Sequence, residues 1–145
     1  MPEPYPQVRI AFQTDHLRNP IRPQSAAEFA AVVDEIVAID DFNSSYATVY
    51  FSTTRGSEIM LGVGVFGRKH LGAILYQSDE EERYTKGERA SQREVFYADF
   101  GNPRYFPQDS EIDLDRVKAT LAALFELDGR LPDTVEWQSW VDTEH

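Results

Sequence analysis

Acidic side chains provide the most conspicuous chemistry in this sequence. Four acids occupy consecutive positions 79–82, and Glu88 follows within the same polar stretch, residues 77–93. Adjacent like charges repel one another, so they resist burial in a core. On a surface, the same charges attract a basic partner and speed its association. The run therefore indicates a partner-binding segment, and a solvated loop without a partner is the simpler alternative.

A second candidate group for binding consists of six aromatic residues: Tyr97, Phe100, Tyr105, Phe106, Trp137 and Trp140. Trp137 and Trp140 lie an odd number of positions apart, so on a strand they face opposite sides of a sheet. If Trp137 faces the core, Trp140 is left to anchor an interface or to pack at the chain end. The candidate partner-binding residues are therefore Asp79, Glu80, Glu81, Glu82, Glu88, Tyr97 and Trp140.

One glycine motif matches a cofactor fingerprint without its structural context. Gly62, Gly64 and Gly67 have the G-x-G-x-x-G spacing of dinucleotide-binding loops. That motif works only when a helix follows, because the helix N-terminus holds the pyrophosphate. Here the basic residues 68–70 and a strand pattern follow instead. We interpret the glycines as strand positions against which a helix or an aromatic ring packs closely, and we expect no cofactor.

Catalytic and metal-binding patterns are weak. The three histidines, His16, His70 and His145, lack the short spacings typical of metal ligands. Asp113 and Asp115 could hint at a carboxylate site, but they stand where a helix begins, and caps explain them better. The sequence contains no nucleophile-elbow motif and no phosphate-binding loop. We therefore expect no catalytic residue and no metal site, and hence no enzyme.

The C-terminal part of the chain predicts a helix, a stop and a strand. An apolar stripe recurs at helical spacing over residues 114–125. Asp113 is placed to cap this helix, Gly129 to end it in a left-handed conformation, and Pro132 to prevent its continuation. Alternation at Val135, Trp137 and Val141 then predicts a strand.

Upstream patterns supply the rest of an α+β fold. Strands are expected at 8–12, 47–52, 58–66, 71–76 and 95–100, and a helix follows the capping-box signature at 25–28 and ends near Ile39. Residues 77–93 are expected to form a long loop or a mobile excursion, and residues 104–107 to lead into the second helix. Hairpin-length links favour an antiparallel sheet. The expected fold is a single domain, residues 1–145, in which two helices pack on one face of a single curved, mainly antiparallel sheet.

Composition limits the function classes. The net charge is −11, which repels nucleic acid and anionic membranes and attracts basic proteins. Cysteine is absent, no apolar run is long enough to span a bilayer, and the N-terminal residues do not resemble a secretory signal. We therefore expect a cytoplasmic protein with a protein partner, without nucleic-acid or membrane partners; the oligomeric state is left open.

One further pattern connects the chain to a known family. The residues Tyr97…Gly101…Tyr105-Phe106-Pro107, followed by Gly129-Arg130-Leu131-Pro132…Val135-Glu136-Trp137, resemble immunity protein family one of bacterial polymorphic toxin systems. The resemblance covers about the second two-thirds of the chain, and Leu131 splits the Arg-Pro pair that is common in the family.

The resemblance implies a small non-catalytic protein that binds a secreted toxin, often a nucleic-acid deaminase, and occludes its active site. Two alternatives remain open. One is an acidic module that shields another basic or nucleic-acid-binding protein. The other is a small enzyme using carboxylates, which a buried acid pair in a pocket would favour.

Overall fold

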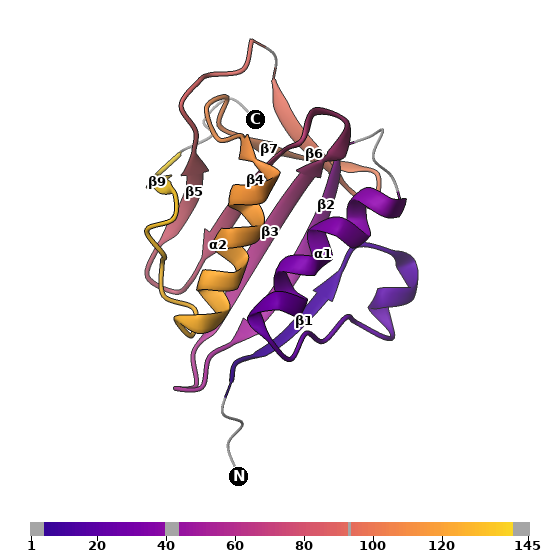
Figure 1. Ribbon diagram of the computed structural model, residues 1–145, viewed down its shortest axis with the longest axis vertical. Coiled ribbons are helices and arrows are strands. Elements are labelled where there is room, and N and C mark those ends of the chain that lie inside the picture. The colour runs from indigo at the N-terminus through magenta and orange to yellow at the C-terminus, as the bar shows by residue number, and fades with distance from the viewer. Residues whose placement is uncertain (1–4, 40–43, 93, 141–145) are drawn as a thin grey trace.

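The computed structural model describes residues 5–39, 44–92 and 94–140, and it shows two helices side by side on one face of a nine-stranded sheet (Figure 1). The helices are α1 (Ala26–Ile39) and α2 (Leu114–Glu126), and two short 3-10 turns are η1 (Thr14–Leu17) and η2 (Gly67–Lys69). The strands are β1 (Gln7–Ala11), β2 (Ser45–Ser52), β3 (Glu58–Phe66), β4 (Leu71–Gln77), β5 (Glu82–Lys86), β6 (Val95–Asp99), β7 (Asn102–Phe106), β8 (Ile112–Asp113) and β9 (Glu136–Gln138).

The sheet is mixed but mainly antiparallel. Its main order is β7-β6-β2-β3-β4-β5-β9, with β1 paired to β2 and β8 paired to β4. The one parallel pairing among the described strands joins Ser45 of β2 to Ala98 of β6. Strands β1 and β6 pair with different residues of β2: β1 with residues 48–52 and β6 with Ser45. In the same way, β5 pairs with residues 75–77 of β4, and β8 pairs with residues 71–72. The predicted α+β class, with two helices on one face, is confirmed.

Local signals set the limits of α2. The Asp113 carboxylate accepts the N–H of Asp115 at 2.8 Å, which caps the first turn. At the other end Gly129 has φ +84°, and its N–H donates to the carbonyl of Leu124 at 2.8 Å. The predicted cap and stop are therefore confirmed, and the apolar stripe of α2 is buried.

Helix α1 begins as its capping signature predicts. The Ser25 hydroxyl accepts the N–H of Glu28 at 3.1 Å. The buried face of α1 packs with that of α2 and with one face of the sheet, forming the main core. Neither helix in the described ranges has the length and apolar character needed to cross a membrane.

A second, smaller core lies on the sheet face that the helices leave open. Its centre is Tyr97 of β6, which is 1% exposed and packs directly against Gly64 of β3, while Tyr46 of β2 packs against Gly62. A Cβ at either glycine would overlap these rings, so the interpretation as close-packing strand positions is confirmed for Gly62 and Gly64. Gly67 is not a strand position, because it begins η2. The remaining members are Ala73, Leu75, Tyr84, Val95 and Phe106.

Two predictions about the middle of the chain were wrong. Residues 77–93 are not one long loop, because β5 pairs with both β4 and β9. Charged residues at both ends of β5 obscured its alternation in the sequence. Residues 104–107 do not simply lead into α2, since Asn102–Phe106 is β7 and pairs with β6. The last predicted strand is β9; Val141 lies outside the described residues.

Candidate functional site

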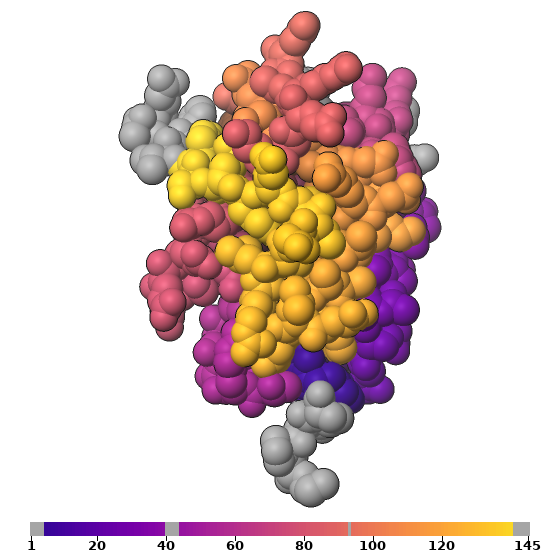
Figure 2. Space-filling model, turned by 60° about the vertical axis from the view of Figure 1, so that its left-hand side comes forward, coloured from indigo at the N-terminus to yellow at the C-terminus, as the bar shows by residue number. Residues whose placement is uncertain are grey.

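Residues 79–82, called the acidic turn below, close the β4–β5 hairpin: Asp79, Glu80 and Glu81 link the two strands, and Glu82 is the first residue of β5. The N–H of Ser78 donates to the carbonyl of Glu81 at 2.9 Å, and the Ser78 hydroxyl accepts the N–H groups of Glu80 and Glu81. The segment around residue 80 projects from the body of the molecule, rose-coloured in Figure 2. A short, internally hydrogen-bonded turn therefore presents these charges.

The charges on this turn are only partly compensated. Glu81 is half-buried and pairs with Arg83 at 3.4 Å, and Glu82 accepts a hydrogen bond from Gln77. Asp79 and Glu80 are exposed and form no ion pair with any residue that the structure describes. The turn therefore offers at least two carboxylates that a basic partner could pair with.

Beside this turn, the open face of the sheet is hollowed into a groove of about 560 Å³. Side chains alternate across a strand, so every second residue of β2, β3 and β4 faces away from the helices. The floor of the groove consists of Tyr46, Thr48, Tyr50, Met60, Leu75 and Gln77.

Aromatic and apolar residues form the walls of the groove. The β6–β7 hairpin contributes Phe100, Tyr105 and Phe106 on one side, and Trp140 contributes on another, where its ring meets Tyr84 edge to face with centroids 5.4 Å apart. Among the described residues, a few large apolar side chains are strongly exposed, and three of them line this groove. They are Leu17, which is 68% exposed, Tyr50, which is 46% exposed, and Phe100, which is 47% exposed. Such a gathering of exposed apolar side chains is typical of an interaction surface.

The two charged residues that line the groove, Asp99 and Arg104, are paired with each other. Arg104 donates to Asp99 at 2.9 Å, and its guanidinium lies 5.7 Å from the centre of the Tyr46 ring. The hydrogen bond to Asp99 raises the pKa of Arg104, and burial raises the pKa of Tyr46 to about 12. The Tyr46 phenol therefore stays neutral near pH 7, and the two charges that line the groove offset each other.

A smaller acidic hollow adjoins the groove. It shares Tyr50, Met60 and Gln77 with the groove, and it adds Glu58, Asp79 and Glu82 as lining residues. The acidic turn and the aromatic groove are therefore parts of one continuous surface.

The structure places the seven predicted partner-binding residues in different surroundings. Trp140 lines the groove, on the opposite sheet face from Trp137, as the odd spacing predicts. Asp79 and Glu82 line the acidic hollow, and Glu80 and Glu81 share their turn. Tyr97 belongs to β6, where its ring is buried against Gly64, and it offers no surface to a partner. Glu88 lies beyond the far end of β5, in a separate hollow with Arg89 and Arg116.

Sequence reasoning missed most of the groove. Tyr50 and Met60 were assigned only to strands, although the Tyr46-x-Thr48-x-Tyr50 alternation sets polar-tipped side chains on one face of β2. Phe100 was part of the candidate aromatic group but was not chosen as a partner-binding residue. That alternation was the available signal. Phe100 adopts φ +51°, which few non-glycine residues do, and this conformation is invisible in the sequence.

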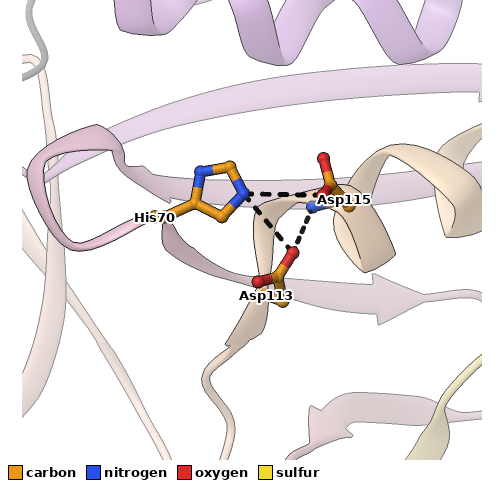
Figure 3. Close-up of side chains that lie close together, drawn as sticks. All are labelled: His70, Asp113 and Asp115. Carbon is orange, nitrogen blue, oxygen red and sulfur yellow. Dashed lines mark hydrogen bonds and ion pairs between the residues drawn. The ribbon is translucent and has the colours of Figure 1, made fainter.

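A histidine and two carboxylates meet at the start of α2 (Figure 3). The Nε2 atom of His70 lies 3.4 Å from a carboxylate oxygen of Asp113 and 3.7 Å from one of Asp115. Their potential ligand atoms lie within 4.8 Å of one another, but all three side chains are exposed. The positive end of the helix dipole and the capping role of Asp113 account for the two acids without a metal.

The carboxylates of the described residues do not form a buried pair. The polar side chains buried in this part of the chain are Thr53, Thr85, Ser110 and Thr120, with no Asp or Glu among them. The geometry therefore gives the carboxylate-enzyme hypothesis no support.

This α+β protein has an apolar groove beside an acidic turn, a combination that is typical of protein-binding surfaces. Comparison with protein families identifies it further: the model of the family "Immunity protein Imm1" matches residues 18–139, and the chain belongs to that family. The match includes the acidic turn and ends one residue before Trp140. A comparison with curated protein sequences found no match to this chain.

Proposed function

We propose that this protein neutralises a cognate secreted toxin by binding the toxin domain and covering its active site. The toxin acts on nucleic acid, with deaminase chemistry as its reaction, and the two proteins meet in the cytoplasm. The observation that carries this proposal is the projecting acidic turn of an Imm1-family protein, on which Asp79 and Glu80 lack a described ion pair.

Charge complementarity supports the choice of partner. An enzyme that acts on nucleic acid needs cationic side chains around its active site to hold phosphates. An exposed acidic turn is attracted to the same cations. An inhibitor with a net charge of −11 that binds there both excludes the substrate and gains rapid association.

Growth rescue tests this proposal. The toxin domain encoded beside this gene is expressed with and without this protein, and survivors are counted. We expect rescue by this protein and no rescue by an unrelated acidic protein. Absence of rescue, with the soluble protein confirmed, would contradict the immunity function.

A charge-reversal variant tests the role of the turn. Asp79, Glu80 and Glu82 are exposed, so changing all three to Lys should leave the fold intact. Glu81 stays unchanged because it is half-buried and paired with Arg83. The matched control changes the exposed acids Glu35, Glu126 and Asp133 to Lys, which gives the same net charge. Protection should fall only in the turn variant; equal protection by both variants would contradict the acidic-turn mechanism.

The net charge also favours a second candidate function, an acidic module that shields other basic proteins. Such a module would bind many basic proteins with a steep salt dependence, whereas a cognate immunity protein is selective. Titration with the toxin domain and with unrelated basic proteins separates the two functions.

A further inference from the structure

The open sheet face contains a docking surface whose chemistry specifies its occupant. We propose that the groove and the acidic hollow together receive one protruding segment of the toxin, in which an apolar side chain enters the groove and flanking Lys or Arg side chains pair with Asp79 and Glu82. This inference rests on the proposed function and adds the place and chemistry of binding.

The apolar half of the surface is suited to a side chain rather than to water. Its floor carries Tyr50 and Met60, and Phe100 and Trp140 stand on its walls. Tyr50 and Phe100 are each almost half exposed, so a partner that covers them removes apolar surface from water, a favourable change. Large aromatic residues that flank a hollow are typical of positions that dominate binding energy.

The acidic half determines the charge of the occupant. Arg104 lines the groove and the guanidinium of Arg9 lies 5.4 Å from the centre of the Tyr50 ring, but each arginine already faces a carboxylate. Arg104 donates to Asp99 at 2.9 Å, and Arg9 lies 4.0 Å from Glu58. Asp79 has no ion pair with the described residues, and Glu82 is bonded to the neutral Gln77. The unpaired charge beside the groove is therefore negative, which favours a cationic segment over an anionic or purely apolar one.

The two halves meet at Met60 and Tyr50. Both residues line the groove and also the acidic hollow. A single segment can therefore reach the aromatic walls and the carboxylates at once. Hydrogen-bonded strands β2, β3 and β4 carry the floor, so the surface is formed before the partner arrives, which lowers the entropic cost of binding.

The first test measures the affinity of the full-length protein for the toxin domain. The groove variant combines Tyr50→Ala with Phe100→Asn, because asparagine tolerates the positive φ at position 100. The matched control combines Phe96→Ala with Leu127→Ala, which are 43% and 41% exposed and line neither hollow. We expect the groove variant to lose affinity by about 100-fold or more and the control by less than about threefold.

The second test uses Met60 as a probe of occupancy. The chain contains two methionines, Met1 and Met60, so a methyl-labelled sample gives a spectrum simple enough to assign by a Met60→Leu variant. Adding the toxin domain should shift the Met60 methyl resonance, and the groove variant should reduce that shift at the same toxin concentration.

The outcomes separate the inference from the function on which it rests. If this protein rescues growth and binds the toxin, but the groove variant keeps its affinity or the Met60 resonance does not move, the docking surface is wrong and the immunity function stands. If this protein neither rescues growth nor binds the toxin, both proposals fail. Loss of affinity confined to the groove variant, together with a shifted Met60 resonance, supports both.

Discussion

Single glycines allow the second core to form. Gly64 of β3 lies directly beneath the ring of Tyr97, and an added Cβ would overlap the body of that buried ring. We therefore predict that Gly64→Ala destabilises the protein by about 1 to 3 kcal/mol, the usual cost of overpacking. Urea unfolding measures this loss. A Tyr97→Leu background removes the ring, so the same substitution should cost less there; additive costs in the double variant would contradict the close contact.

The carboxylate of Asp128 stabilises the folded protein to an extent that depends on pH. Burial raises its pKa, but hydrogen bonds from the side chain and N–H of Thr54, with the charges of Arg55 and Arg130, outweigh this and lower the pKa overall. A lowered folded-state pKa adds stability that is complete above the unfolded-state pKa of about 4 and is lost as the pH falls through the folded-state value.

Removal of the Asp128 charge should therefore lower the free energy of unfolding most near neutral pH. We predict that Asp128→Asn, which suits the positive φ of this position, lowers the free energy of unfolding by about 1 kcal/mol at about pH 7 and by much less at about pH 2.5. Denaturant unfolding at the two pH values checks this, with Asp133→Asn as an exposed control. A loss of equal size at both pH values would show that the charge of Asp128 is not responsible.

At the scale of elements, one buried hydroxyl fastens β5 to its neighbours. Thr85 is 0% exposed; its hydroxyl accepts the N–H of Ile74 at 3.1 Å and donates to the carbonyl of Ser110 at 2.9 Å. We predict that Thr85→Val costs about 2 to 4 kcal/mol, because two buried backbone groups lose their partner. Thr85→Ser keeps the hydroxyl and should cost about 1 kcal/mol. Amide exchange at Ile74 should speed up in the valine variant; unchanged exchange there would contradict this role.

The elements also show which features a sequence can reveal. Helix α2 was predictable because Asp113 and Gly129 act within one turn of the residues they cap. Strand β5 was not, since the partner of the buried Thr85 hydroxyl, Ser110, is 25 positions away. The acidic run was visible in the sequence, but one wall of the groove comes from the β6–β7 hairpin, whose Tyr97 ring packs on Gly64 of β3. Strand β5 and the groove depend on contacts between segments that are distant in the sequence, and local propensities do not predict such contacts.

For the whole molecule, the distribution of charge should govern how fast the toxin is captured. A net charge of −11 attracts a basic toxin from every side, whereas the turn concentrates charge beside the groove. We predict that the association rate constant falls by about tenfold between about 0.05 and 0.5 M salt, because screening shortens the reach of these charges, while the dissociation rate constant changes far less. Stopped-flow mixing over a range of salt concentrations measures both constants.

The two charge-reversed variants separate local from global steering. The turn variant (Asp79, Glu80 and Glu82 to Lys) and the control (Glu35, Glu126 and Asp133 to Lys) have the same net charge, so any difference between them comes from where the charge lies. If the field near the docking surface guides encounter, the turn variant should lose most of the salt dependence and the control should keep most of it. Equal losses would mean that total charge steers the toxin and that the turn acts only after contact.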